Sequence, residues 1–417
     1  MERAQAIIEH LGACKKPFQS RKTAAAGRKD PDDIVIVSAL RTPIGRARRG
    51  AFKDTPPLAL LVPPLKAVLK ETGLKPDQVD DIVVGNVRGV GLHRQAAFIA
   101  GFGDHTCIRS VNRACSSGLQ AIADVAADLS KGYYDIGIAA GVESMSMDTW
   151  TPNPALVKKT RELITENQDA IDCLIPMGIT SENVAEKFGV SRQEQDELAV
   201  MSHARAFAAS QRDQPEIVPV VAQVIDQMSG EVKTVTVSKD EGIRSGTSLQ
   251  KLLTLRPAFK QGGTTTAGNS SQVSDGGAAV VLMKRSHAAK LGIKAIGTFR
   301  SFVVKGVPPS IMGIGPAEAI PAALAKAGLT KEDIDLYEIN EAFASQAVYC
   351  VKKLGLSWDN VNVNGGAIAL GHPLGCTGAR MTATLLHELK RRNLRYGIVS
   401  MCIGSGQGAA AVFEREY

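Results

Sequence analysis

The stretch LKETGLKPDQVDDIVVGNV, residues 69–87, decides the fold, because a second version of it lies further along the chain. That version, LAKAGLTKEDIDLYEINEA, covers residues 324–342. In both, a helical pattern ends at a glycine (Gly73 or Gly328), a short helical turn follows, and an apolar residue and an aspartate precede a strand. The shared order predicts that a whole structural unit is duplicated.

A second pair of segments repeats at nearly the same offset. Residues 115–144, CSSGLQAIADVAADLSKGYYDIGIAAGVES, match residues 376–406, CTGARMTATLLHELKRRNLRYGIVSMCIGSG. Each has small residues, a glycine, a long amphipathic helix and then a glycine-rich apolar strand. We therefore predict an α/β fold of two halves, with mixed, mostly parallel sheets covered by helices. Ligands of such sheets bind where strands end and loops converge.

The composition changes between the two repeated halves, where polar helices and a short strand pair follow one another. We interpret this part as an inserted lobe. The predicted division is residues 1–31 as a presequence and tether, 32–147 with 264–294 as the N-terminal half, 148–263 as the lobe and 295–417 as the C-terminal half.

Composition excludes several classes of protein. The 417 residues carry a net charge of +7, but lysine and arginine are spread along the chain and no nucleic-acid motif accompanies them, so we expect no nucleic-acid partner. No run reaches the roughly 18 apolar residues of a membrane span. The seven cysteines are irregularly spaced and form no CxxC pair, so we expect reduced thiols and no metal.

The N-terminal segment carries a possible targeting signal. RAQAIIEHL, from Arg3 to Leu11, resembles the N-terminal nonapeptide signal for peroxisomal import, which implies an import receptor as a partner. An ordinary frayed terminus is one alternative. A mitochondrial transit peptide, basic and amphipathic, is another, and Glu2 and Glu9 count against it.

Cys115 is a candidate nucleophile because it directly precedes a helical pattern. Unpaired N–H groups at a helix N-terminus stabilise thiolate over thiol. A buried cysteine that only packs is the alternative. Cys376 lies inside the repeat at the position that matches Ser116, and we interpret it as a packing residue.

Three further segments supply polar groups. His372 lies between a glycine and a proline, which favours a defined turn and a ring that lines a cavity. Cys402 ends an apolar strand and enters a glycine-rich turn whose N–H groups, that of Gly404 included, can face a ligand oxygen. Asn340 follows a strand, where an asparagine can also simply cap a helix.

Five segments together resemble the thiolase family, in the family's order and over the chain from about Ile34: NRACSSG, GNSSQVSDG, NEAFASQA, GGAIALGHPLGCTGAR and SMCIGSGQGAAAVF. Within the family the similarity is greatest to the peroxisomal 3-ketoacyl-CoA thiolases of plants and green algae. The resemblance implies a layered α-β-α-β-α arrangement with an inserted loop domain. It implies CoA-dependent cleavage of 3-ketoacyl-CoA to acetyl-CoA and a shortened acyl-CoA in fatty-acid β-oxidation.

The resemblance also assigns roles. Cys115 would form the acyl-enzyme after His372 accepts its proton, and Cys402 would act as general acid and base. One oxyanion hole would consist of His372 and a water held by Asn340, and the other of the backbone N–H groups of Cys115 and Gly404.

The implied CoA and acyl contacts are Arg244, Phe259, Ser271, Met177, Met312 and Phe343. No permanently bound cofactor is implied, with CoA as a co-substrate and a homodimer as the assembly. Pro176 stands where short-chain enzymes have a histidine, which favours longer acyl chains. The chain departs from the family pattern at Ala114, at Lys251, in the shorter loop 87–98 and in GSGQG, where GTGMG is common.

Other functions compete with this interpretation, among them RNA binding, which the basic charge suggests. A decarboxylating ketoacyl synthase shares the fold and the nucleophile, but it has no second cysteine like Cys402. A biosynthetic acetyl-CoA C-acetyltransferase runs the same chemistry in reverse. A non-catalytic acyl-CoA-binding homologue would not require the set of Cys115, Asn340, His372 and Cys402.

Overall fold

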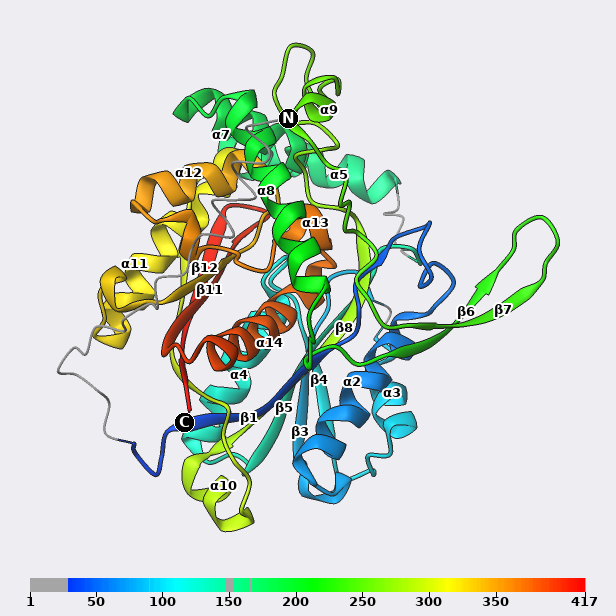
Figure 1. The fold of residues 1–417 in the computed structure, drawn as a ribbon, viewed down its shortest axis with the longest axis vertical. Helices are drawn as coiled ribbons and strands as arrows, with labels where there is room; N and C mark the ends of the chain where they lie inside the picture. The colour runs from blue at the N-terminus through cyan, green and yellow to red at the C-terminus, as the bar shows by residue number, and fades with distance from the viewer. Residues whose placement is uncertain (1–28, 90, 148–153, 166, 417) are drawn as a thin grey trace.

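The structure is a computed structural model that describes residues 29–89, 91–147, 154–165 and 167–416. The nonapeptide from Arg3 to Leu11 lies outside the described residues. Nine strands form one path of hydrogen-bonded neighbours (Figure 1). In spatial order they are β10 (Leu336–Ile339), β11 (Tyr396–Ile403), β12 (Gln407–Arg415), β9 (Gly297–Gly306), β1 (Ile34–Arg41), β8 (Ser274–Lys284), β5 (Ile136–Ser144), β3 (Asp81–Gly85) and β4 (Cys107–Val111), with β2 (Gly45–Arg46) beside β8.

This path consists of two sheets joined at a short seam. Strand β1 pairs with β9 only at Val35 and Ile36, which face Thr298 and Gly297. The four strands before the seam come from the C-terminal half of the chain, and the strands after it come from the N-terminal half. Each half of the chain therefore builds a sheet of its own, as the repeat predicts.

Helices cover both faces of both sheets. α4 (Ser117–Lys131) and α14 (Leu374–Arg392) pack between the sheets, and their apolar residues share one core with Ile36 of β1 and Met401 of β11. The outer faces are covered by α2 (Pro57–Thr72) and α3 (His93–Ala100) on the N-terminal sheet, and by α11 (Gly315–Ala327) and α12 (Ala344–Leu354) on the C-terminal sheet. Because side chains alternate along a strand, Val35 faces the outer core while Ile36 faces the central one. The expected α-β-α-β-α layering is confirmed (Figure 1).

The duplication extends to individual hydrogen bonds. Oδ2 of Asp80 accepts from the backbone N–H groups at the start of β5, at 3.1 and 3.0 Å. Oδ2 of Asp335 accepts from those at the start of β11, at 2.7 and 2.9 Å. Both preceding helices, α2 and α11, end at a glycine in the left-handed region, Gly73 with φ 72° and Gly328 with φ 67°. The two copies thus use the same residues in the same structural roles.

The expectation of mostly parallel sheets is wrong. Only β3–β4, β3–β5 and β10–β11 are parallel among the strand pairs of the described sheet. The remaining pairs are antiparallel, because β12 turns back on β11 at once and β8 re-enters the N-terminal sheet against β5. A tight turn allows only an antiparallel return.

The segment between β5 and β8 adds helices and a strand pair that pack against the two halves. In chain order these are α5 (Pro154–Ile164), α6 (Gln168–Asp172), α7 (Met177–Phe188), α8 (Arg192–Ser210), β6 (Val220–Ile225), β7 (Val232–Val237) and α9 (Leu249–Leu253). The short helices α10 (Arg285–Leu291) and α13 (Ala367–Leu370) belong to the two halves. Helix α8 begins at a capping box, in which Ser191 and Glu194 exchange hydrogen bonds.

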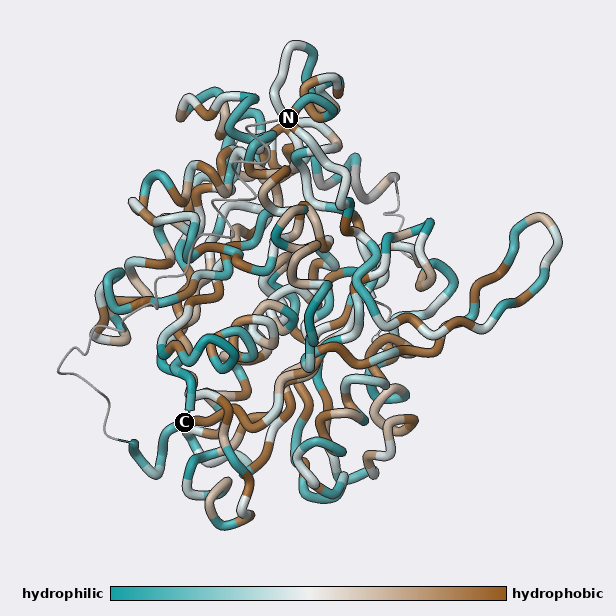
Figure 2. Tube along the Cα trace, viewed as in Figure 1, coloured by the Kyte–Doolittle hydropathy of each residue, from teal (hydrophilic) through white to brown (hydrophobic). Residues whose placement is uncertain are grey.

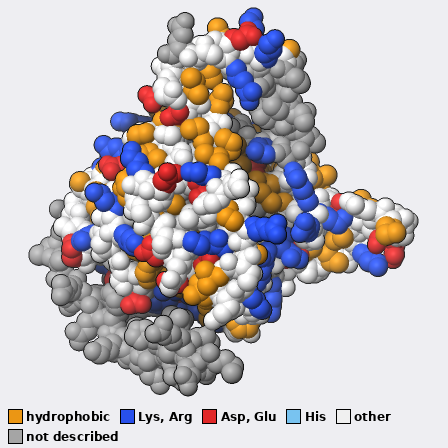
Figure 3. All heavy atoms as spheres, turned by 90° about the horizontal axis from the view of Figure 1, so that it is seen from above, with side chains coloured by type: hydrophobic (Ala, Val, Ile, Leu, Met, Phe, Trp, Pro, Cys, Tyr) orange, Lys and Arg blue, Asp and Glu red, His pale blue; other side chains and the backbone are white. Residues whose placement is uncertain are grey.

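Strands β6 and β7 form a hairpin that extends away from the body (Figure 1). Figure 2 shows hydrophobic residues along the hairpin as well as along the strands of the sheets. Val221 is 68% exposed and Met228 at the tip is fully exposed. A groove at the root of the hairpin is lined by Arg49, Lys233 and Lys239, and Figure 3 shows lysine and arginine side chains gathered on this side of the molecule. Part of the net positive charge is therefore concentrated beside the hairpin.

Candidate active site

Cys115 lies in a tight turn between β4 and α4. The residue before it, Ala114, has a φ of 42°, in the left-handed region that is unfavourable for a residue with a Cβ. Its N–H donates to Oδ1 of Asn112 at 2.9 Å, and its carbonyl accepts from Oγ of Ser117 at 2.7 Å. These bonds hold the strained turn, and they place the thiol immediately before the first turn of α4.

Cys115 is partly exposed, but desolvation of its sulfur raises the pKa of the thiol above its ordinary value. The backbone N–H groups of Gly404 and of Cys115 itself face the sulfur and act in the opposite direction, while Glu143 raises the pKa further. The helix terminus alone predicts a stabilised thiolate, but here burial outweighs it. The raised pKa favours the thiol over the thiolate at neutral pH, so a base is needed to make Cys115 a nucleophile.

His372 lies directly before α14 in a fixed turn. Gly371, the preceding residue, has a φ of 111°, and a Cβ there would approach Oγ of Ser274 to 2.0 Å. The backbone N–H of His372 donates to the carbonyl of Gln272 at 3.0 Å. The expectation of a defined turn that requires glycine is confirmed.

Both ring nitrogens of His372 have polar neighbours. Nδ1 lies 2.6 Å from Oγ1 of Thr377, and Nε2 lies 3.3 Å from Nδ2 of Asn340. Burial and the charge of Arg380 lower the pKa of His372 to about 3, so the ring is neutral at physiological pH. No hydrogen bond joins the ring to Cys115, although both residues are in the described part of the chain.

Asn340 directly follows β10, and its side chain lies beside the ring of His372. The residue is 1% exposed, and its Oδ1 has no hydrogen-bond partner. A buried carbonyl oxygen without a partner is costly unless a water or a ligand satisfies it. The orphaned oxygen beside Nε2 of His372 fits the expected water.

The close packing of α4 against α14 brings Cys115 and His372 to the same region. A Cβ on Gly118 would approach the carbonyl oxygen of Gly375 to 2.6 Å, and one on Gly378 would approach the backbone nitrogen of Leu119 to 2.2 Å. These contacts lie in the first turns of both helices. The two helix N-termini, each with its candidate residue, therefore meet between the sheets.

Cys402 ends β11 and lies in a small apolar cluster. It is fully buried and packs with Met312 and Ala342, and the partly buried Met177 and Phe343 border the same cluster. Burial, followed by the neighbouring Cys115 and Cys350, raises its pKa well above the ordinary value. Cys402 is thus a thiol close to Cys115, which suits a proton donor.

Of the remaining candidates for CoA binding, Phe259 and Ser271 contact residues of this cluster, whereas no such contact is described for Arg244. The Phe259 ring packs edge-on against Phe343 with ring centroids 6.1 Å apart, and the N–H of Ser271 donates to the carbonyl of Ala342 at 3.1 Å. Arg244 is exposed, and its backbone N–H donates to Nδ1 of His203 at 3.2 Å. No described hydrogen bond or ion pair joins the Arg244 side chain to the cluster.

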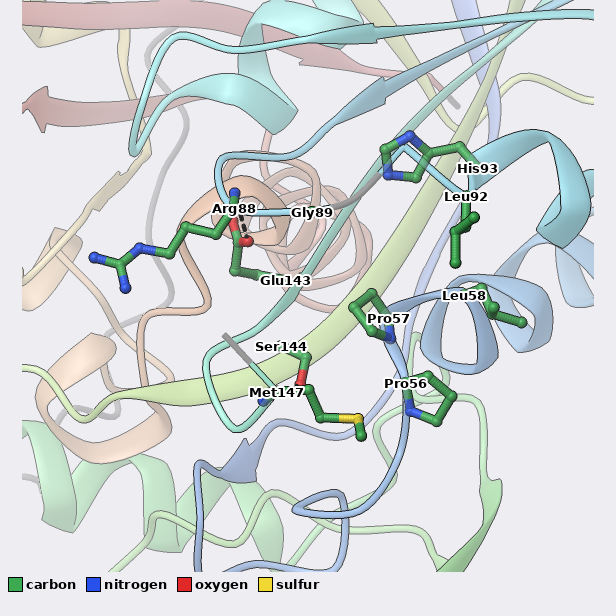
Figure 4. A pocket seen from close by; sticks show the side chains of 10 residues that line it. All are labelled: Pro56, Pro57, Leu58, Arg88, Gly89, Leu92, His93, Glu143, Ser144 and Met147. Carbon is green, nitrogen blue, oxygen red and sulfur yellow. Dashed lines mark hydrogen bonds between the residues drawn. The ribbon is translucent and has the colours of Figure 1, made fainter. Parts of the chain in front are cut away.

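The sequence analysis did not identify Glu143, a buried carboxylate at the end of β5. Its Oε1 accepts from the backbone N–H of Arg88 at 3.1 Å, and its Oε2 accepts from that of Gly375 at 2.9 Å. Figure 4 shows Glu143 beside Arg88 in a pocket that is also lined by His93 and Met147. The signal in the sequence was a charged residue within the otherwise apolar strand GVES.

None of the helices in the described part of the chain combines the length and apolar character needed to cross a membrane. Within the same residues, no three His, Cys, Asp or Glu side chains are grouped so that they could hold a metal ion.

Comparison with known proteins agrees with the fold. Residues 34–286 match the family model described as "Thiolase, N-terminal domain", and residues 293–415 match "Thiolase, C-terminal domain". The chain belongs to the thiolase family.

Several similar proteins belong to one group within the thiolase family. The chain is 55% identical over 425 residues to the mouse protein "3-ketoacyl-CoA thiolase A, peroxisomal", covering 99% of each chain. It is 58% identical over 404 residues to "3-ketoacyl CoA thiolase 1, peroxisomal" of Petunia hybrida, covering 95% of this chain and 86% of that one. The crystal structure of the dimeric peroxisomal thiolase of Saccharomyces cerevisiae superposes with a TM-score of 0.83 at 44% identity, covering 93% of this chain and 99% of that chain.

Proposed function

We propose that the chain catalyses the CoA-dependent cleavage of 3-ketoacyl-CoA into acetyl-CoA and a shortened acyl-CoA in fatty-acid β-oxidation. It is an acyltransferase of the acetyl-CoA C-acyltransferase class. One observation carries this proposal: the backbone N–H of Gly404, in the turn that directly follows the second buried thiol, Cys402, acts on the thiol of Cys115 and lowers its pKa, and Cys115 in turn raises the pKa of Cys402.

In the first half-reaction, His372 takes the proton of Cys115 at Nε2 and the sulfur attacks the 3-carbonyl carbon. The bond between C2 and C3 then breaks, and C2 leaves as the enolate of acetyl-CoA. Cys402 protonates that carbon, and the acyl group stays on Cys115 as a thioester. The backbone N–H groups of Cys115 and Gly404 face the sulfur, which suits them to bind the oxyanion of the attacked carbonyl.

In the second half-reaction, Cys402 recovers a proton from the incoming CoA thiol. The CoA sulfur attacks the thioester carbon, and the shortened acyl-CoA leaves as the bond to the Cys115 sulfur breaks. The Cys115 thiolate then takes back the proton that Nε2 of His372 has held since the first half-reaction. His372 and a water held by Asn340 would stabilise the enolate oxygen of the first step. The loss of one donor from such a hole typically costs about 3–4 kcal/mol of transition-state stabilisation.

Binding of the acyl-CoA is assigned to the apolar cluster and its rim. Met177, Met312 and Phe343 border Cys402, and Phe259 extends this surface toward solvent. Ser271 and Arg244 would contact the CoA moiety further out, and CoA acts as a co-substrate without a permanent cofactor. Pro176 directly precedes α7, next to Met177, and supports substrates longer than acetoacetyl-CoA.

The similar proteins support a proposal for the assembly and the location. A homodimer is supported by the yeast thiolase, whose structure is described as dimeric. In this chain β4 is the outermost strand of the N-terminal sheet and its side chains are largely exposed, so a second copy could pair there. Peroxisomal location is supported by the names of the relatives, and residues 3–11 would bind the import receptor.

Mass spectrometry of the intact protein tests the proposal. After brief exposure to 3-ketohexadecanoyl-CoA without free CoA, the wild type is expected to gain the mass of the shortened acyl group, and Cys115→Ser is expected to gain nothing. Acetoacetyl-CoA in place of the long substrate measures chain-length preference. An unmodified wild type that still binds CoA would show that the chain is a non-catalytic acyl-CoA-binding homologue.

The biosynthetic acetyl-CoA C-acetyltransferase reaction is the second candidate, because an acetyl-CoA acetyltransferase from Bacillus anthracis superposes with a TM-score of 0.84 at 38% identity. If that function dominates, the enzyme should acylate rapidly with acetoacetyl-CoA and not measurably with the sixteen-carbon substrate.

A further inference from the structure

Thr377 is the closest polar neighbour of the His372 ring. It lies in the first turn of α14, five residues after the histidine, and its Oγ1 is 2.6 Å from Nδ1. His372 is 5% exposed and Thr377 is fully buried. Bulk water therefore does not compete for this hydrogen bond, and the pair is held by the rigid start of one helix.

The other side of the ring determines the direction of this bond. Nδ2 of Asn340, 3.3 Å from Nε2, is an amide nitrogen and can only donate. With the amide of Asn340 oriented in this way, Nε2 carries the lone pair and a neutral ring has its proton on Nδ1. The Nδ1–H group donates to Thr377 Oγ1, which is within reach to accept.

We infer that Thr377 is a positioning residue that holds His372 in the tautomer with a free lone pair on Nε2, the form that can remove the proton from Cys115. This inference rests on the proposed function. When the Cys115 proton moves to Nε2 and the sulfur bonds to the carbonyl carbon, Nδ1 keeps its own proton, and its bond to Thr377 becomes charge-assisted and stronger. Without that acceptor only the longer contact with Nδ2 of Asn340, at 3.3 Å, still favours this tautomer. The opposite tautomer, whose Nε2–H cannot act as a base, then becomes more populated.

The chain offers a matched control in the same helix. Thr382 is also fully buried, and its Oγ1 donates to the carbonyl of Gly378 at 2.9 Å, with no contact to His372. Thr377→Val and Thr382→Val each remove one buried hydroxyl from α14 and preserve the shape of the side chain. Thr377→Ser keeps the acceptor and removes only a methyl group.

The rate of Cys115 acylation in a single turnover separates a positioning role from a structural one. We expect Thr377→Val to slow acylation by about 10- to 100-fold, within the range for a disturbed general base, with little change in KM. Thr377→Ser should restore most of the rate, and Thr382→Val should match the wild type. An acylation rate for Thr377→Val within twofold of that for Thr382→Val would overturn the inference.

A spectroscopic measurement keeps the inference testable even if the wild type forms no acyl-enzyme. In protein labelled with ¹⁵N-histidine, the imidazole shifts report which nitrogen carries the proton, and His372→Asn assigns the signal among the seven histidines. The wild type should show the Nδ1–H form, and Thr377→Val should show a mixture or the Nε2–H form. A wild-type signal from the Nε2–H form would overturn the inference, whereas a missing acyl-enzyme alone would refute only the proposed function.

Discussion

The guanidinium of Arg113 joins the two halves of the molecule, donating from Nη1 to Oε1 of Gln407 at 2.9 Å. Its Nε also donates to Oε1 of Gln120 in α4, at 2.6 Å. Arg113 lies two residues before Cys115, and Gln407 directly follows the turn that contains Gly404. The side chain thus connects the nucleophile turn to the glycine-rich turn whose N–H faces the thiol.

Replacing Gln407 with methionine, the residue common at this position in the family, tests that connection. The variant loses the acceptor for Arg113 and should be about 1–2 kcal/mol less stable in urea unfolding, as for a partly buried hydrogen bond to a charged group. Gln407→Glu keeps an acceptor and serves as the control. Equal stability of the methionine variant and the wild type would show that the bond contributes nothing.

The left-handed backbone at Ala114 predicts opposite effects for two substitutions. Ala114→Gly removes the Cβ at positive φ and should raise the free energy of unfolding by up to about 1 kcal/mol. Ala114→Val adds a β-branched side chain there and should lower it by roughly 1–3 kcal/mol. Denaturant unfolding of both variants checks the signs, and a destabilised glycine variant would contradict the strain.

The alkylation of Cys115 by iodoacetamide should depend on pH in one direction only. The thiol has a pKa raised by burial above its ordinary value of 9.0, so its thiolate fraction and alkylation rate should rise through the alkaline range. His372, with its pKa lowered to about 3, stays neutral across pH 5–8 and should add no inflection near 6.5. The modified peptide must be identified by mass spectrometry, because Cys107 and Cys173 are exposed. An inflection near pH 6.5 that disappears in His372→Ala would show that the ring titrates.

The contact between α4 and α14 does not tolerate a methyl group at Gly118. Gly118→Ala would force its Cβ against backbone atoms of α14, and overpacking of this kind costs about 1–3 kcal/mol. Because the same contact holds both helix N-termini, acylation of Cys115 should also slow. Ser130→Ala at the exposed end of α4 is the matched control. A Gly118→Ala enzyme with unchanged stability and rate would mean that the helices separate without consequence.

Much of the fold could be predicted from the repeat, because the same local pattern of helix end, short turn and strand occurs twice. The directions of the strands could not. Sequence periodicity reveals a strand but not which neighbour it pairs with, and β8 joins its sheet only after the long insertion. Strand order depends on contacts between residues far apart in the chain.

The sequence was a better guide to which residues form the candidate site than to the pKa shifts of those residues. Cys115, His372, Cys402 and Asn340 were identified from segments that lie far apart in the sequence. The sequence also predicted a stabilised thiolate at Cys115. The helix that follows Cys115 can be predicted from the sequence, but the desolvation of its sulfur cannot. Burial depends on the packing of all surrounding elements, and it determines the direction of the pKa shift.

The contacts of the two helix N-termini show how the two copies of the repeat differ at the proposed site. The start of α4 faces Gly404 after β11, and the start of α14 faces Glu143 at the end of β5. When the two copies of the repeat are aligned, Gly375 of the second copy corresponds to Cys115 of the first. Val142 of the first copy corresponds to Cys402 of the second. A Cβ on Gly375 would lie 2.7 Å from the carbonyl oxygen of Gly85, so no side chain fits there. The two copies thus differ at matching positions: one carries the thiol of Cys115, and the other is a close backbone contact that holds the two halves together.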